Sequence, residues 1–130
     1  MTEMHKELAS FWSQFEYKGQ AIPAYYTGMI PKGATYPYCT FSVGKGEAFT
    51  TGIQTAFIWH KRKEGLSPLM ACAESLDAVE KAIPKAGVKI PAGDGFIVLY
   101  RNDSDWLSYM QDEEDPDVMG ARVSYQIYYL

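Results

Sequence analysis

The stretch MQDEEDPDVMGARVSYQIYYL, residues 110–130, joins a dense acidic run to an alternating aromatic pattern. The acidic run places five carboxylates in six positions: Asp112, Glu113, Glu114, Asp115 and Asp117. Pro116 occupies the sixth position. Downstream, Val123, Tyr125 and Ile127 alternate with polar or amphipathic residues, which is the period of a half-buried strand. The stretch therefore predicts an acidic loop at 112–117 followed by a terminal strand.

This loop accounts for most of the acidity of the protein. The 130 residues carry 16 acidic and 12 basic side chains, a net charge of −4. Without the five loop carboxylates, 11 acidic residues face 12 basic ones. The only short basic cluster, HKRK at 60–63, is followed by Glu64, so the sequence does not suggest nucleic-acid binding as the main task.

Composition indicates one domain of ordinary size. Hydrophobic residues make up 47% of the chain and aromatic residues 15%, which is enough to build one packed core. Ten tyrosines and three tryptophans are more than such a core needs, and these side chains are favoured in protein–protein contacts. We expect no membrane span, because no stretch approaches eighteen apolar residues.

The N-terminal half predicts a helix, an arm and a hairpin. An apolar stripe at helical spacing predicts a helix over residues 1–18, and three prolines in residues 20–37 favour an extended arm. Residues 38–63 predict a hairpin whose glycine-rich loop, 44–52, we expect to be mobile. In its second strand we expect a buried face of Ile53, Phe57 and Trp59, with Gln54, Ala56 and Ile58 opposite.

The C-terminal half predicts a second helix and the remaining strands. Ser67 and Pro68 form a typical helix start for residues 67–83, and Pro84 ends the helix. The apolar run at 96–101 indicates a central strand, and residues 96–130 then contain the terminal strands. We therefore expect an α+β domain with one antiparallel or mixed sheet of about four strands and two helices packed on one face.

The acidic loop does not match a calcium-binding motif. An EF-hand loop that starts at Asp115 would need an oxygen ligand at Met119 and a glutamate at Gln126. The charge run favours a solvated hairpin turn, and an electrostatic surface for a basic partner or a channel is the functional alternative.

Other candidate groups also favour structural roles. Asp103 and Asp105 lie two residues apart in a loop, where such side chains commonly bond to backbone amides. A dyad of His60 with Cys39 or Cys72 is left open by the sequence, although Cys72 falls on the apolar stripe of a helix. We expect no metal, no cofactor and no catalytic site.

Four segments in order carry a resemblance to a known family. YPYCTFSVG, FIWHKR, GFIVLYR and DEEDPDVMGARVSYQIYYL resemble the tail terminator proteins of long-tailed bacteriophages and prophages over residues 36–130. The family often has tandem basic residues after the acidic loop, whereas this chain has only Arg122.

The resemblance implies a structural virion protein rather than an enzyme. Such proteins form a hexameric ring that caps the tail tube, ends tail polymerisation and offers the head a docking surface, while DNA passes through the lumen without specific binding. The expected partners are further copies of the chain, the tail tube protein and head–tail connector proteins. The expected location is the head–tail junction of the virion, after synthesis in the bacterial cytoplasm. The candidate interface residues are Lys45, Glu47, Phe49, Lys61, Arg62, Lys63, Asp112, Glu113, Glu114, Asp115, Asp117 and Arg122.

Two alternatives are open at this point. One is another ring of the head–tail connector, such as a head-completion or adaptor protein. The other is a small α+β hydrolase or ligand-binding domain that uses Asp103, Asp105 and His60.

Overall fold

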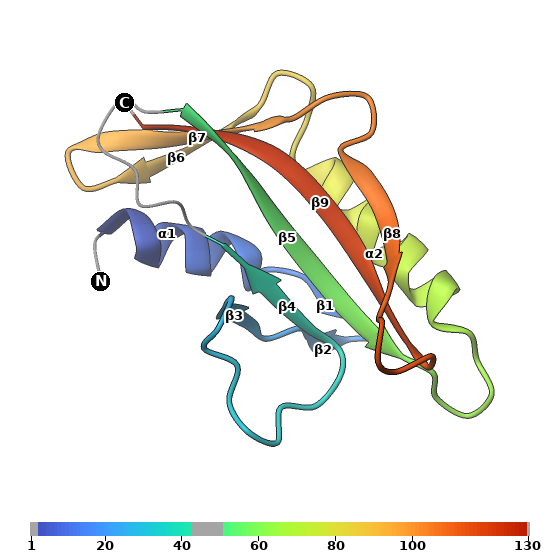
Figure 1. The fold of residues 1–130 in the computed structure, drawn as a ribbon. Coiled ribbons are helices and arrows are strands. Elements are labelled where there is room, and N and C mark those ends of the chain that lie inside the picture. The colour runs from blue at the N-terminus through green and yellow to red at the C-terminus, as the bar shows by residue number, and fades with distance from the viewer. Residues whose placement is uncertain (1–2, 43–50, 130) are drawn as a thin grey trace.

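The computed structural model describes residues 3–42 and 51–129 (Figure 1). These residues form an α+β fold of two helices and nine strands. The elements are α1 (Glu3–Trp12), β1 (Glu16–Tyr17), β2 (Gln20–Ala21), β3 (Ala24–Tyr26), β4 (Tyr38–Phe41), β5 (Thr51–Lys61), α2 (Pro68–Ala82), β6 (Val88–Ala92), β7 (Gly95–Arg101), β8 (Leu107–Gln111) and β9 (Val118–Tyr129).

The terminal strand β9 is the centre of the main sheet. The strand order is β3-β4-β5-β9-β7-β6, and β8 also pairs with β9. Antiparallel pairing with β5 runs continuously from Thr51↔Tyr128 to Lys61↔Val118. Figure 1 shows β5 and β9 side by side along the length of the molecule. The sheet is mixed, because β3 and β4 are parallel while the other pairs are antiparallel.

On its other side β9 pairs first with β8 and then with β7. The segment between these two strands bulges out opposite Ser124. The amide of Asn102 donates to the Ser124 carbonyl at 3.3 Å, and the Ser124 amide donates to the Trp106 carbonyl at 2.7 Å. Both backbone groups of Ser124 are therefore satisfied, and β7 and β8 together act as one interrupted partner strand.

Both helices pack against the same face of the sheet, here called the inner face. One core cluster contains Leu8 and Trp12 of α1, Leu76 and Val79 of α2, and inward side chains of the sheet. In Figure 1 both helices lie behind the sheet. This arrangement agrees with the expected α+β class.

The predicted face of β5 is wrong. Ala56, Ile58 and His60 are buried in the inner face, whereas Ile53 is 63% exposed. Phe57 and Trp59 are only partly buried, because they point to the opposite, outer face. The sequence favoured the wrong face as the buried one, because the inner side chains include a small alanine and a histidine, while the outer ones are large and apolar.

The first helix is shorter than predicted and ends at Trp12. The Ser13 hydroxyl donates to the Ala9 carbonyl and the Gln14 amide donates to the Phe11 carbonyl, so side chains take over the last backbone acceptors. β1 and β2 follow as a tight hairpin around Lys18 and Gly19, both with positive φ.

The strand count is higher than predicted. Seven strands form the main sheet instead of about four, and β1 and β2 form a separate pair. β6 was not predicted, because it is only five residues long and contains Pro91, which cannot donate a hydrogen bond to a neighbouring strand. Its place at the edge of the sheet tolerates a proline, since an edge strand leaves one row of amides unpaired.

The second helix agrees closely with its prediction. Ser67 is the N-cap, and its hydroxyl accepts from the Leu69 amide at 3.2 Å. Pro68 occupies the first turn, where its missing amide hydrogen leaves no bond unmade. At the other end Arg101 donates to the carbonyls of Ile83 (2.8 Å) and Glu80 (3.2 Å), which closes the helix against β7.

Gly120 is required by close packing on the outer face. A β-carbon at this position would lie 2.9 Å from the Trp59 ring, which itself donates to the Thr40 hydroxyl at 3.1 Å and stacks on Phe57. We expect Gly120→Ala to lower the free energy of unfolding by about 1–3 kcal/mol, because the ring must leave these partners. Urea unfolding followed by tryptophan fluorescence measures the loss.

Gly52→Ala is the matched control. Its added β-carbon would lie 3.5 Å from the Gln54 side chain, which is ordinary contact. Equal stability of the two variants would contradict the packing argument for Gly120.

Candidate functional site

The acidic segment 112–117 is a hairpin connection between β8 and β9. The amide of Asp112 donates to the Val118 carbonyl at 3.1 Å, and the Val118 amide donates to the Asp115 carbonyl at 3.1 Å. Gln111 lies beneath the turn, where its side-chain amide donates to the carbonyls of Pro116 (3.1 Å) and Val118 (2.7 Å). The hairpin-turn interpretation is thus confirmed.

Two of its carboxylates pair with basic residues of the same chain. Lys61 Nζ lies 3.3 Å from Asp115, and Arg62 Nε donates to Asp117 at 3.2 Å. The Arg62 amide also donates to the Asp117 carbonyl at 2.7 Å, which extends the β5–β9 ladder into the loop. A backbone hydrogen bond from Asp117, together with Lys61, holds the pKa of Asp115 below its usual value.

The other three carboxylates have no cationic partner among the described residues. Glu113 and Glu114 are exposed, and Asp112 is half-buried and accepts a hydrogen bond from the Glu114 amide. In the half of the loop next to β9, Asp115 and Asp117 therefore form ion pairs. The other half, residues 112–114, is here called the acidic tip and has no cationic partner among the described residues. The negative charge of Asp112 reaches the outer face, where it helps to raise the pKa of Tyr38, after burial and a hydrogen bond to Tyr36.

The outer face of the sheet carries a row of aromatic and apolar side chains, and no described helix covers it (Figure 1). Strand pairing aligns the rows, because directly opposed residues point to the same side. Phe57 and Trp59 stack with ring centroids 5.0 Å apart, and Tyr38 lies opposite Trp59. The residues that the register places on this face include Tyr25, Tyr38, Ile53, Phe57, Trp59, Tyr100, Met110, Arg122 and Tyr128.

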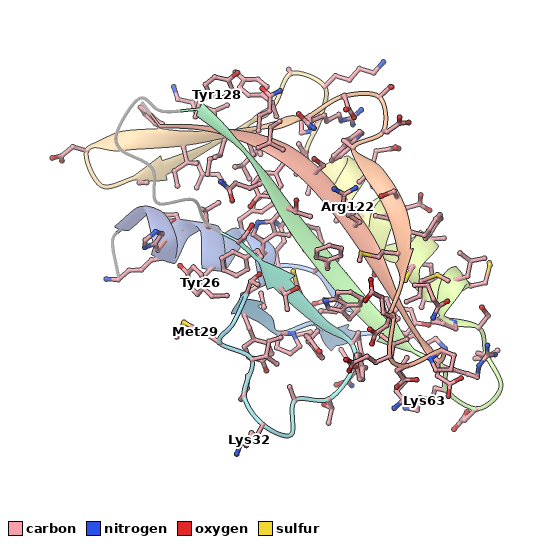
Figure 2. All side chains as sticks on the ribbon, viewed as in Figure 1. Tyr26, Met29, Lys32, Lys63, Arg122 and Tyr128 are labelled. Carbon is pink, nitrogen blue, oxygen red and sulfur yellow. The ribbon has the colours of Figure 1, made fainter. Side chains whose placement is uncertain are left out.

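A shallow hollow and one exposed arginine are further features of this face. The hollow measures about 400 Å³ and is lined by Val98, Tyr100, Gln126 and Tyr128. Arg122 is exposed, lies opposite Phe57, and has no carboxylate within ion-pair distance among the described residues. Figure 2 shows Arg122 in the middle of the face and Tyr128 farther along the same strand. The sequence had indicated Arg122, but the hollow depends on strand register and was missed.

His60 lies on the inner face of the sheet. It is 2% exposed, its Nε2 lies 2.8 Å from the Ser75 hydroxyl, and the Tyr17 ring packs edge-on at 4.9 Å. Burial lowers the pKa of His60 from 6.5 to about 4, so the ring is neutral at pH 7.

The cysteines do not form the dyad that the sequence left open. The partner of His60 is Ser75, whereas the Cys72 thiol lies 3.4 Å from the Met119 carbonyl. Burial raises the pKa of Cys72 to about 12 and also raises that of Cys39, so both are protonated thiols at neutral pH.

Asp103 and Asp105 are distant from His60. Asp103 accepts from the Asp105 amide at 2.8 Å, which confirms the expected turn-stabilising role. Their segment lies opposite Ser124, whereas His60 lies opposite Met119, five residues or roughly 17 Å along β9. The three residues do not form one site.

The other predicted site residues divide into two groups. Lys63 is exposed at the end of β5, beside Lys61 and Arg62. Lys45, Glu47 and Phe49, and nearly all of the loop predicted to be mobile, lie outside the described residues. In residues 3–42 and 51–129 no group of His, Cys, Asp or Glu is arranged to hold a metal ion. No helix in the same ranges is long and apolar enough to cross a membrane.

Comparison of the chain with protein-family models, curated proteins and solved structures found no significant match.

Buried His60 predicts a specific dependence of stability on pH. The unfolded chain takes up a proton near pH 6.5, whereas the folded chain resists protonation down to about pH 4. The unfolded state therefore binds more protons between these values, and stability falls as the pH falls. We expect His60 to lower the free energy of unfolding by about 2 kcal/mol as the pH falls from 7 to 4.5.

The comparison is with His60→Gln, which can still bond to Ser75 but does not titrate. Urea unfolding across this pH range gives the slope for each protein. Identical slopes would contradict the assignment of a neutral, buried His60.

Proposed function

We propose that this protein is a structural component of a bacteriophage or prophage virion. It forms a ring that caps the tail tube, ends tail polymerisation and provides the surface on which the head docks. The observation that best supports the proposal is the aromatic outer face of the sheet, which no described helix covers. Aromatic side chains and arginine are the residues enriched at the cores of protein interfaces.

The outer face has the chemistry of a surface that meets another protein. Ile53 is 63% exposed and Met110 is 40% exposed, and both lie beside half-buried aromatic rings. A hollow of about 400 Å³ lies beside Tyr100 and Tyr128 and can take a side chain from a partner. Arg122 adds one charge that a neighbouring subunit can pair, which gives the contact a fixed register.

The acidic loop has a narrower role in this proposal than the sequence alone suggested. Either the loop lines the lumen, or it meets the basic cluster of a neighbouring subunit. Lys61 and Arg62 are already paired with Asp115 and Asp117 of their own chain, which leaves only Lys63 of that cluster for a neighbour. The lumen assignment is therefore the better supported one for residues 112–114. Negative charge there repels the DNA backbone, so that the strand passes without binding.

Another ring of the head–tail connector is the nearest alternative, and the outer face suits it equally well. The enzyme alternative has lost its candidate group, because Asp103 and Asp105 are far from His60 along β9.

Reversal of the acidic tip tests the proposal and separates the two kinds of ring. We expect Asp112→Lys, Glu113→Lys and Glu114→Lys together to abolish infectious particles, because three cations would bind DNA in the lumen or prevent ring closure. Electron microscopy of the lysate gives tube lengths. Tubes of unregulated length indicate a terminator, and tubes of normal length without heads indicate a connector.

The control reverses three exposed carboxylates on α2, Glu74, Asp77 and Glu80, which changes the net charge equally. An unchanged titre for the loop variant, or equal losses for the two variants, would contradict the proposed role of the tip.

A further inference from the structure

A cleft at the end of the molecule is separate from the outer face. It has a volume of about 430 Å³ and lies between the β1–β2 hairpin, the arm around Tyr36, the end of β5 and the start of α2. Figure 2 shows Lys63, one of its lining residues, at the lower right of the molecule. Cavities of this size are typical of small-molecule sites.

Two tight turns place lysines at the cleft. Lys18 and Gly19 have positive φ in the β1–β2 hairpin, and Glu64 and Gly65 have positive φ in the turn closed by the Lys63–Leu66 bridge. Successive positive φ values define short turns of fixed shape. The positions of Lys18 and Lys63 are therefore set by the backbone.

The cleft carries more positive than negative charge. Lys18, Lys61 and Lys63 line it, together with one carboxylate, Glu64. Lys61 is shared with Asp115, whereas Lys18 and Lys63 are exposed and have no ion-pair partner among the described residues. Two ammonium groups are thus left to bind an anion.

The remaining lining combines aromatic and apolar side chains with a few polar ones. Tyr17 and Tyr36 contribute rings, with Lys18 Nζ 5.4 Å and Lys61 Nζ 5.8 Å from their respective centroids. His60 contributes an uncharged ring that is held by Ser75. Aromatic and apolar walls with a few charged groups are the usual composition of a ligand pocket.

We propose that this cleft binds a small molecule that carries a phosphate or carboxylate group on an aromatic ring. Lys18 and Lys63 bind the anionic group, and the ring packs between the tyrosines. The volume suits a compound of one or two rings better than a folded partner. The proposal is independent of ring assembly, because none of the outer-face residues named above lines this cleft.

Phenyl phosphate is the test ligand, and inorganic phosphate and phenol represent its two halves. Titration followed by ¹H–¹⁵N NMR reports binding through the amides of Gly19 and Gly65, which lie in the two turns. We expect phenyl phosphate to bind at least about tenfold more tightly than either half, because both kinds of contact are needed. Benzoate, tested beside it, shows whether carboxylate replaces phosphate.

Two variants locate the site. Lys18→Asn with Lys63→Gln removes both unpaired charges, and asparagine tolerates the positive φ of position 18. We expect this double variant to bind phenyl phosphate about tenfold more weakly. Ala21→Phe fills the cleft from an exposed position without a charge change and should also weaken binding.

Lys85→Gln, an exposed lysine outside the cleft, is the control and should bind as the original chain does. Absence of saturable binding up to about 10 mM phenyl phosphate would overturn the proposal. Equal affinity for phenol, or unchanged affinity in both cleft variants with their fold intact by circular dichroism, would overturn it as well. The titration uses the isolated chain, so failure of the ring proposal does not affect the result.

Discussion

The pairing of β9 on both sides is the constraint on which the rest of the structure depends. β5 bonds to it from Val118 to Tyr128, and the interrupted strand β8–β7 occupies its other side. With every neighbour position filled, the strand cannot shift by one residue without exchanging its buried and outer side chains. The register then fixes three features at once: the core beneath Tyr125, the aromatic row on the outer face, and the position of the acidic loop beside Lys61 and Arg62.

The acidic loop follows directly from this pairing. The β5–β9 ladder continues into the Arg62–Asp117 backbone hydrogen bond. The basic residues at the end of β5 therefore lie beside the acidic residues that precede β9. Asp115 and Asp117 then pair with cations of the same chain, and the three carboxylates at the tip have no cationic partner among the described residues. The acidic run therefore contains two carboxylates in ion pairs and three without a cationic partner among the described residues. The sequence alone does not distinguish the two groups.

Local chemistry in the sequence predicted local structure well. The capping pair Ser67–Pro68 located α2, and the alternation after Pro116 located β9. The pairing of strands that are far apart in the chain was harder to predict from the sequence. The face of β5 was misassigned because Phe57 and Trp59 look like core residues, although only the register with Gly120 and Arg122 shows that they point outward. β6 was missed because an edge strand can contain Pro91. Lys18, Tyr36 and Lys63 are far apart in sequence and line one cleft only in the folded chain, so no motif could indicate it.

The central claim is that the uncovered outer face joins copies of this chain, and native mass by light scattering tests it most directly. The original chain should approach six subunits as its concentration rises, and Met70→Gln, at a 69% exposed position on α2, should do the same. Ile53→Gln combined with Arg122→Glu should remain a folded monomer under identical conditions. A tight dimer for all three proteins, or equal assembly of the outer-face variant, would contradict the account.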